Sequence, residues 1–180
     1  IEVGQLSLSL GPVPAKKVIE ECLSQVKLRA DENSIRLIDQ TEEEDLPVLW
    51  TDQTRLKQVI LNLLANAVKY NRKGGSVTIG CEQNTNGALR ILVADTGYGI
   101  PADKVSKLFV PFDRLGREAG SIEGTGIGLS ISKQIIEMLG GQIGYLSNDD
   151  KGTTFWVEVP VHNNERSEAR TEISTPGITN

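Results

Sequence analysis

The chain has 180 residues, 38% hydrophobic and 24% charged, a composition typical of one soluble globular domain with a core of its own. Its net charge of −5 argues against nucleic acid as a partner, because a surface that binds nucleic acid is normally basic. Cys22 and Cys81 form no metal-binding or disulfide pattern, and no long apolar run or secretory leader is present, so we expect no membrane contact by this segment.

Hydrophobic spacing predicts three short strands and a helix in the first part of the chain. Residues 6–10 alternate strictly between apolar and polar, which predicts a strand that Gly11–Pro14 then interrupts. Apolar residues at helical spacing predict a helix that ends near Ala30. Further strands are expected over residues 34–39 and 48–50.

The strongest helix signal follows Asp52, whose carboxylate can cap a helix. The predicted helix covers residues 53–70 and has an apolar stripe made of Leu56, Val59, Ile60, Leu63, Leu64 and Ala67. Two strands are expected next, over residues 76–83 and 88–94, joined by a turn that contains an Asn-Gly pair. The second strand is almost wholly apolar, which predicts that both of its faces are covered.

The second half begins with loops at residues 95–125, interrupted by a short helical stretch at 103–108. A helix is predicted over residues 126–139, ended by Gly140, with its core-facing side made of Ile131, Ile135, Met138 and Leu139. Strands at 142–147 and 153–159 form a closing hairpin, and residues 161–180 are expected to be a disordered tail. These elements predict an α/β sandwich of two layers, with about three helices on one face of a mixed sheet of about five strands.

One polar stripe on the helix at 53–70 has a pattern suited to chemistry. Asn62, Asn66 and Lys69 lie at positions i, i+4 and i+7, and therefore on one face of the helix. Amide oxygens can bind Mg²⁺, and an ammonium group can bind phosphate oxygens. Taken alone, the stripe is better explained as a solvated helix edge, because Asn and Lys are common surface residues.

Two glycine-rich segments follow. Asp95-Thr96-Gly97-Tyr98-Gly99 comes directly after a hydrophobic strand, where the carboxylate could accept a hydrogen bond from the exocyclic amine of a base, although an ordinary Asp-Gly turn would look the same. Gly124-Thr125-Gly126-Ile127-Gly128-Leu129 opens a helix, and free amides at a helix start suit phosphate. This second segment is neither a Walker A loop nor a Rossmann fingerprint, and a plain flexible loop is the alternative.

Taken in order, these segments resemble the histidine kinase branch of the GHKL ATPase superfamily. Residues 62–70 are similar to the N box of that family, 95–99 to its first glycine box, 108–114 to its F box, 124–129 to its second glycine box, and 152–155 to its last conserved turn. The resemblance covers residues 6–160, and residues 1–5 are expected to be the remnant of a preceding dimerisation helix.

The chain departs from the family pattern at two points. Tyr98 stands where the family usually carries a smaller or aliphatic residue or proline, which could alter the rim of the pocket. The phosphoaccepting histidine of the family is absent, and the only histidine, His162, is expected to be an ordinary exposed residue.

The resemblance implies the Bergerat fold, with ATP and Mg²⁺ held beneath a mobile lid at residues 113–123. Asp95 would accept a hydrogen bond from the adenine amino group, Asn66 would bind the metal, and Thr153 would act through an ordered water. Asn62, Lys69 and Arg114 would be the catalytic residues near the phosphates, and Phe109 and Phe112 would anchor the lid or serve packing alone. The full set of implied nucleotide contacts is Asn62, Asn66, Lys69, Tyr70, Asp95, Gly97, Gly99, Arg114, Gly124, Thr125, Gly126, Gly128, Leu129 and Thr153.

The implied function is transfer of the γ-phosphoryl group of ATP to a histidine on a separate dimerisation domain, in a two-component signalling pathway with a response regulator downstream. The segment would be a cytoplasmic monomer, whether or not the parent kinase is anchored in the inner membrane. The alternatives are a nucleotide-gated binding module without transfer activity, a serine-kinase anti-sigma factor and a hydrolytic ATPase. The hydrolytic relatives carry a glutamate base where Asn62 stands, so we expect slow ATP hydrolysis.

Overall fold

The computed structural model describes residues 7–41, 45–84, 86–111, 127–147 and 152–162. Its elements in chain order are β1 (Gly11–Pro14), α1 (Ala15–Glu32), β2 (Arg36–Asp39), β3 (Val48–Thr51), α2 (Gln53–Lys69), β4 (Ser76–Gln83), β5 (Ala88–Asp95), the 3₁₀ helix η1 (Ala102–Lys107), α3 (Gly128–Met138), β6 (Gln142–Ser147) and β7 (Thr153–Pro160).

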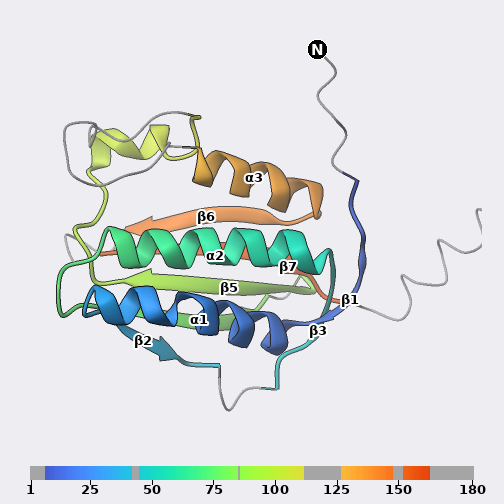
Figure 1. Cartoon of the computed structure of the whole chain (residues 1–180). Coiled ribbons are helices and arrows are strands. Elements are labelled where there is room, and N and C mark those ends of the chain that lie inside the picture. Colours follow the sequence, from blue (N-terminus) through green and yellow to red (C-terminus); the bar gives the residue numbers. More distant parts are fainter. Residues whose placement is uncertain (1–6, 42–44, 85, 112–126, 148–151, 163–180) are drawn as a thin grey trace, which may run out of the picture.

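The strands form one large sheet and one small one. Five strands lie in the order β2-β4-β5-β7-β6, and β1 pairs with β3 in a separate two-stranded sheet. The β2–β4 pair is parallel, and the other neighbours of the large sheet are antiparallel. Helices α1, α2 and α3 all lie on the same face of the large sheet (Figure 1). The predicted mixed sheet of about five strands with three helices on one face is confirmed.

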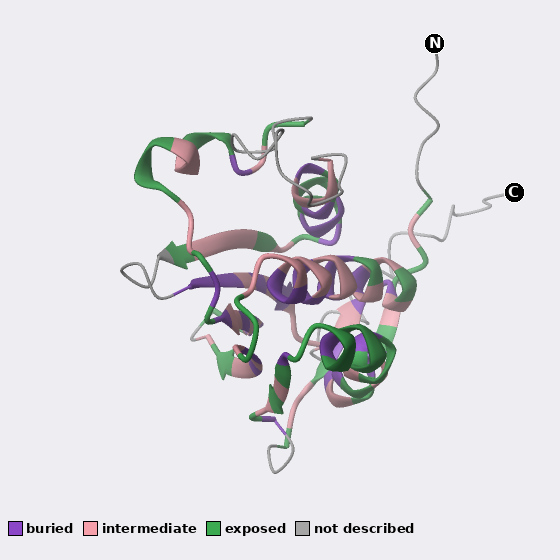
Figure 2. Cartoon of the chain, turned by 60° about the vertical axis from the view of Figure 1, so that its left-hand side comes forward, coloured by how far each residue is buried: buried purple, intermediate pink, exposed green. Residues whose placement is uncertain are grey.

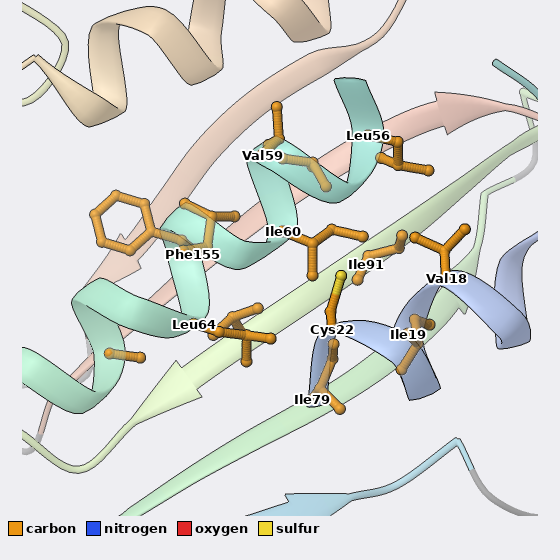
Figure 3. Packing of buried hydrophobic residues seen from close by; sticks show 14 of the residues in the cluster. Val18, Ile19, Cys22, Leu56, Val59, Ile60, Leu64, Ile79, Ile91 and Phe155 are labelled. Carbon is orange, nitrogen blue, oxygen red and sulfur yellow. The ribbon is translucent and has the colours of Figure 1, made fainter. Parts of the chain in front are cut away.

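The core lies between the three helices and the covered face of the sheet. Figure 3 shows Ile60 and Leu64 of α2 pointing toward Ile91 of β5, with Cys22 of α1 beside them. All four of these side chains are almost completely buried, as is the whole apolar stripe predicted for α2. Burial of this apolar surface supplies the main driving force that holds the two layers together.

Strand β5 differs from its prediction. Its burial alternates along the strand, with Leu89, Ile91 and Val93 buried and the residues between them only half-buried. The prediction that both faces are covered is therefore wrong. The second face includes Arg90, whose guanidinium lies over the Trp156 ring of β7, and Leu92, which lies opposite Trp156 in the strand register. The same one-sided burial is visible in the helices, whose inner sides are buried and outer sides exposed (Figure 2).

The first strand also differs from its prediction. Residues 7–10 form no strand, and β1 instead covers Gly11–Pro14, the stretch that was expected to interrupt one. The upstream alternation is only partly matched by burial, since Leu8 packs half-buried against the core but Leu10 is 38% exposed. Val13 is buried and pairs with Leu49 of β3, and an edge strand of this kind tolerates proline because not every amide needs a partner.

Helix α3 starts near the predicted position but presents a different face to the core. Ile131 and Met138 are 38% and 40% exposed, whereas Ser130 and Ser132 are buried. The prediction placed both apolar residues toward the core and is wrong for these two. The buried serine hydroxyls are hydrogen-bonded, Ser130 to the Ile127 carbonyl and Ser132 to Asn62 of α2. Small serine side chains let α3 approach α2 closely.

The remaining predicted elements are confirmed within a few residues. Asp52 caps α2 by accepting a hydrogen bond from the Arg55 amide at 3.0 Å, and β4 and β5 form the predicted hairpin. The Gly140 residue that follows α3 has a φ of 77°, which is typical of a glycine that ends a helix. No helix in the described ranges is long and apolar enough to cross a membrane.

Beyond the predicted end of the domain at Pro160, two more residues belong to the structure. Val161 forms an isolated bridge with Leu49, and the His162 amide donates to the Val48 carbonyl at 2.8 Å. The His162 ring stacks on Trp50 with 5.1 Å between ring centroids, so this histidine is half-buried rather than exposed as expected. The segments 1–5 and 163–180, for which a helix remnant and a tail were predicted, lie outside the described residues.

Candidate nucleotide-binding site

The predicted site residues come together at one end of the sheet. The C-terminal half of α2, the loop after β5, the start of α3 and the start of β7 meet there, at the left-hand end of Figure 1. The register places Ala94 of β5 opposite Thr154 of β7, so that Asp95 and Thr153 are brought together although they are far apart in sequence. The fold thus gathers four segments that the sequence could only place in order.

Asn62 joins helix α2 to helix α3. Its Nδ2 atom donates to the Ser132 hydroxyl at 2.9 Å, and its amide lies directly against Gly128 at the start of α3. A Cβ atom on Gly128 would overlap Asn62 Oδ1 and lie 3.1 Å from Asn62 Cγ. A side chain at this position would therefore have to displace the Asn62 amide, because the close approach of the two helices places the start of α3 beside the polar stripe of α2.

The other members of the polar stripe are half-buried. Asn66 lies one turn after Asn62, and within the part of the chain that the structure describes no side-chain hydrogen bond occupies its amide. The Lys69 ammonium lies 5.0 Å from the centroid of the Tyr70 ring, in a cation–π contact. Tyr70 is the C-terminal cap residue of α2, and its amide donates to the Asn66 carbonyl at 2.9 Å.

Asp95 is the last residue of β5 and is 8% exposed. Its Oδ1 atom accepts hydrogen bonds from the Gly97 amide at 2.8 Å and from the Thr153 amide at 3.3 Å. Two backbone donors on one oxygen fix the plane of the carboxylate. Such bonds also offset the cost of burying a charged group.

The backbone around Asp95 is packed tightly enough to require glycine. At Gly152, directly before Thr153, φ is 113° and a Cβ atom would overlap the Asp95 carbonyl. A Cβ atom on Gly97 would overlap the Tyr70 carbonyl and lie 3.1 Å from Asn71 Cα. The first glycine loop is thereby pressed against both β7 and the end of α2. Gly99 has a φ of 69° and turns the chain away from the sheet.

Several predicted residues are not placed by the structure. Arg114, Gly124, Thr125 and Gly126 lie outside the described residues, as do Phe112 and the predicted lid. Of the flanking residues that are described, Leu129 is half-buried in the first turn of α3. Phe109 is half-buried against the core, and the Lys133 ammonium lies 5.7 Å from the centroid of its ring.

The structure adds residues that the sequence did not single out. Ser132 binds Asn62, and Asn71 and Thr96 bind each other beside the first glycine loop at 3.2 Å. Thr96 lies within the predicted glycine box, so its position in the sequence could have indicated that it belongs to the site. Ser132 and Asn71 are ordinary polar residues of a helix and a turn, and only the tertiary contacts distinguish them.

A separate groove of about 320 Å³ lies between the ends of α1 and α2. Its lining includes Lys69 and Asn71, but no residue of the first glycine loop and no residue of α3. It is lined by Glu32, Asn33, Ser34, Ile35, Val68, Lys69, Asn71 and Lys73. The groove therefore lies beside the cluster of predicted site residues and is not the space between α2, α3 and Asp95.

The described part of the site has the chemistry that a nucleotide requires. Amide and ammonium groups on α2 can serve phosphates and a divalent cation, and a buried carboxylate can serve the amino group of a base. The start of α3 adds a helix N-terminus on the same side. The fold and these groups together define a two-layer nucleotide-binding domain.

Comparison with known protein families identifies this class. The sequence profile described as the histidine kinase-, DNA gyrase B- and HSP90-like ATPase matches residues 51–163, from the end of β3 to just past β7. The chain belongs to this family. The match includes all of the predicted site residues, those outside the described ranges among them.

Two similar relatives are adaptive-response sensory kinases. The adaptive-response sensory kinase SasA of Prochlorococcus marinus is 37% identical over 155 residues, which are 86% of this chain and 40% of that protein. SasA of Synechococcus elongatus is 38% identical over 158 residues, again 40% of its length. The chain thus spans about two fifths of the length of these relatives.

Solved structures with this fold include histidine kinases. Full-length ShkA in complex with AMPPNP has a TM-score of 0.75 and 29% identity, covering 88% of this chain and 32% of ShkA. The catalytic domain of the histidine kinase ThkA has a TM-score of 0.73 and 30% identity, covering 85% of this chain and 96% of that domain. ThkA in complex with its response regulator TrrA matches with a TM-score of 0.70 and 29% identity, covering 86% of this chain and 42% of that one.

Proposed function

We propose that this domain binds Mg²⁺–ATP and transfers the γ-phosphoryl group to a histidine on a separate dimerisation domain. The observation that carries the proposal is the buried Asp95 carboxylate, held by two backbone amides at the end of β5, in a loop whose Gly97 packs against the end of the N box helix. The kinase names of the relatives support the reaction class, and the AMPPNP complex of ShkA supports ATP as the nucleotide.

Asp95 would recognise adenine through its carboxylate. Because Gly97 and Thr153 already donate to Oδ1, the carboxylate plane is fixed before the nucleotide binds. A preorganised acceptor loses little entropy when it binds the amino group. Thr153 would add a second contact to the base through an ordered water.

The polar stripe of α2 would hold the metal and the phosphates. Asn66 fits a Mg²⁺ ligand, because an amide oxygen is a suitable donor and its amide has no hydrogen bond among the described residues. Lys69 and Arg114 would neutralise phosphate charge, and Asn62 would lie nearby. Gly124, Thr125, Gly126, Gly128 and Leu129 would supply backbone amides, and the bound metal would stabilise the charge that develops on the leaving phosphate.

In the reaction itself, a neutral imidazole nitrogen of the acceptor histidine would form a bond to the γ-phosphorus. The bond between that phosphorus and the bridging oxygen would break, and ADP would leave with the bridging oxygen. The domain contributes position and charge neutralisation, which dominate phosphoryl transfer. A response regulator would then take the phosphoryl group from the histidine, a step for which the ThkA–TrrA complex is the structural parallel.

The experiment that tests the proposal has two stages. Calorimetry with ATP, ADP and GTP, with and without Mg²⁺, should show micromolar-range binding, a preference for adenine and a gain in affinity with Mg²⁺. The domain should then phosphorylate a supplied dimerisation domain that carries the acceptor histidine, and a His-to-Ala version of that partner should stay unlabelled. Absence of nucleotide binding at millimolar ATP would contradict the whole proposal.

The two stages also separate the alternatives. Binding without phosphorylation of any supplied partner would indicate a nucleotide-gated module instead. Rapid ATP hydrolysis by the domain alone would indicate a hydrolytic ATPase. We expect hydrolysis to be slow, because Asn62 is an amide engaged with Ser132 and cannot act as a general base.

A further inference from the structure

The end of α2 is in direct backbone contact with the first glycine loop. The Tyr98 amide donates to the Tyr70 carbonyl at 3.4 Å, and Gly97 is packed against that same carbonyl. The helix that carries the proposed metal ligand therefore touches the loop that carries the proposed adenine acceptor. The contact is made at Tyr70 and the residue after it, Asn71.

The Asn71 side chain adds hydrogen bonds to this backbone contact. Its Nδ2 atom donates to the Ser76 carbonyl at 2.9 Å, and its Oδ1 atom accepts from the Arg72 amide at 2.8 Å. The Thr96 hydroxyl lies 3.2 Å from Asn71 Oδ1 and accepts from the Ser76 amide at 2.9 Å. We call the group formed by Asn71, Thr96 and Ser76 the Asn71–Thr96 junction.

The single hydroxyl hydrogen of Thr96 can serve only one acceptor at a time. Asn71 Oδ1 at 3.2 Å is the nearer acceptor, and the Ser76 carbonyl lies at 3.4 Å. The Ser76 carbonyl already receives the Asn71 amide and the Thr96 backbone amide. The arrangement that satisfies every group therefore directs the Thr96 hydroxyl to Asn71.

Gly75 packs closely against the junction. A Cβ atom on Gly75 would overlap Asn71 Oδ1 and lie 2.7 Å from the Thr96 hydroxyl oxygen. The Arg72 guanidinium also covers the neighbouring Tyr98 ring, with 5.3 Å between its carbon and the ring centroid. The Asn71 amide therefore lies between the turn after α2, where it binds the Arg72 amide, and the glycine loop, where it binds Thr96.

Thr96 is the middle residue of the turn that orients Asp95. It stands between Asp95 and Gly97, whose amide binds the Asp95 carboxylate. The β5 strand fixes the backbone of Asp95, but Thr96 itself is exposed and follows the end of the sheet. A side-chain anchor at Thr96 therefore determines where the Gly97 amide lies, and with it the direction of the carboxylate.

We infer that Asn71 is a positioning residue for adenine recognition, acting through Thr96 on Asp95. The junction holds the adenine acceptor of the glycine loop at a fixed place relative to the α2 helix that faces the phosphates. The inference rests on the proposed function, and it adds a residue that contacts neither the base nor the metal. The reason is mechanical: three hydrogen bonds hold the Asn71 side chain, and the one to Thr96 ties the turn to the end of α2 in addition to the backbone bonds of the turn.

The test compares ATP with inosine triphosphate, which carries a carbonyl oxygen in place of the adenine amino group. Affinities are measured by calorimetry with Mg²⁺ for the wild type, Asn71→Ala, Thr96→Val and Thr96→Ser. Losing the junction should weaken ATP binding about threefold to tenfold, the loss expected for one or two hydrogen bonds. The affinity for the inosine nucleotide should fall less than the affinity for ATP, so the preference for ATP over the inosine nucleotide should decrease. Thr96→Ser keeps the hydroxyl and should retain the wild-type preference.

Asn33→Ala is the matched control. Asn33 also directly follows a helix and donates its side-chain amide to a backbone carbonyl, that of Arg29, at 2.7 Å, but it touches no part of the glycine loop. The Asn33→Ala variant should prefer ATP over the inosine nucleotide as strongly as the wild type does, even if its melting temperature falls. Melting curves for every variant separate a loss of folding from a loss of positioning.

The outcomes distinguish this inference from the proposed function. If both Asn71→Ala and Thr96→Val keep the wild-type preference for ATP, whatever their melting temperatures, the positioning role of Asn71 is overturned. The proposed function is then unaffected. A wild type that binds both nucleotides equally overturns adenine recognition by Asp95, and this inference falls with it. Should Asn71→Ala fail to fold, the Thr96→Val and Thr96→Ser pair still decides the question.

Discussion

The amide nitrogen of Thr153 lies 3.3 Å from the Oδ1 atom of Asp95, so the first residue of β7 binds the side chain of the last residue of β5. The two strands are adjacent and antiparallel, and Gly152 crosses the Asp95 backbone too closely for any side chain. The carboxylate is thus held from the β7 side as well as by its own loop. This contact links two sequence motifs that are separated by most of the second half of the chain.

The first prediction concerns that carboxylate. Asp95→Asn should weaken ATP binding about tenfold to a hundredfold, because a charged hydrogen-bond acceptor is replaced by an amide that offers one oxygen. Binding of the inosine nucleotide should fall less. Calorimetry of the variant beside Asp31→Asn, a change at an exposed position of α1, measures the effect. Unchanged ATP affinity in Asp95→Asn would remove this residue from the adenine site.

The second prediction concerns the metal. Asn66→Ala should reduce the gain in ATP affinity that Mg²⁺ provides, while affinity without metal stays near that of the wild type. The amide oxygen of Asn66 is the proposed ligand, and alanine offers none. Calorimetric titrations in Mg²⁺ and in a chelator give the two affinities for each protein. A variant with the full wild-type dependence on Mg²⁺ would show that Asn66 does not bind the metal.

The third prediction concerns the contact between α2 and α3. Gly128→Ala should lower the free energy of unfolding by about 1–3 kcal/mol, because the new methyl group overlaps the Asn62 amide and must displace it or the helix. Urea denaturation measures the loss. Gly11→Ala is the matched control, since a Cβ atom there meets nothing within 4 Å. Equal stability of the two variants would contradict the packing described for Gly128.

The fourth prediction concerns pH and the cap of α2. Burial by itself would raise the pKa of Asp52, but hydrogen bonds from the Ser9, Arg55 and Thr54 amides outweigh it and leave the pKa below its ordinary value of 3.8. A carboxyl with a depressed folded-state pKa contributes stability that is present above the unfolded value and is lost as the pH falls through the folded value. The stabilisation should therefore be complete at neutral pH and decline below pH 3.8.

Asp52→Ala should accordingly be less stable than the wild type by about 1 kcal/mol at neutral pH. The difference should shrink once the pH falls below 3.8 and the wild-type carboxyl becomes protonated. Urea unfolding of both proteins across this range measures the effect. A stability difference that stays constant from neutral pH to the most acid point would exclude a charged cap.

The fifth prediction concerns a buried thiol. Burial raises the pKa of Cys22 to about 12, so almost none of it is thiolate near neutral pH. In a Cys81→Ser variant, whose only thiol is Cys22, reaction with a chromogenic aromatic disulfide should be slow and should accelerate on adding urea. The converse variant, Cys22→Ser, reports on the half-buried Cys81. Fast reaction of Cys22 in the native protein would contradict its burial.

The sequence by itself determined most of the local structure and the family. Helix α2, the β4–β5 hairpin and the first glycine loop were predictable, because the spacing of apolar residues, capping residues and glycines acts over a few neighbouring residues. The polar stripe of Asn62, Asn66 and Lys69 followed from helical geometry alone. The motifs in order then indicated the family to which the profile match assigns the chain.

Only the tertiary structure decided which faces were buried and which residues met. Residues 6–10 alternate like a strand, but β3 pairs with Gly11–Pro14, and the second face of β5 is only half-buried although the strand is almost wholly apolar in sequence. Likewise, α3 turns Ser132 inward because its partner is the Asn62 amide, and Asn71 reaches Thr96 only after β4 and β5 have paired. Contacts between residues distant in sequence depend on how the layers assemble, and a pattern read along one segment carries no information about the segment that will cover it.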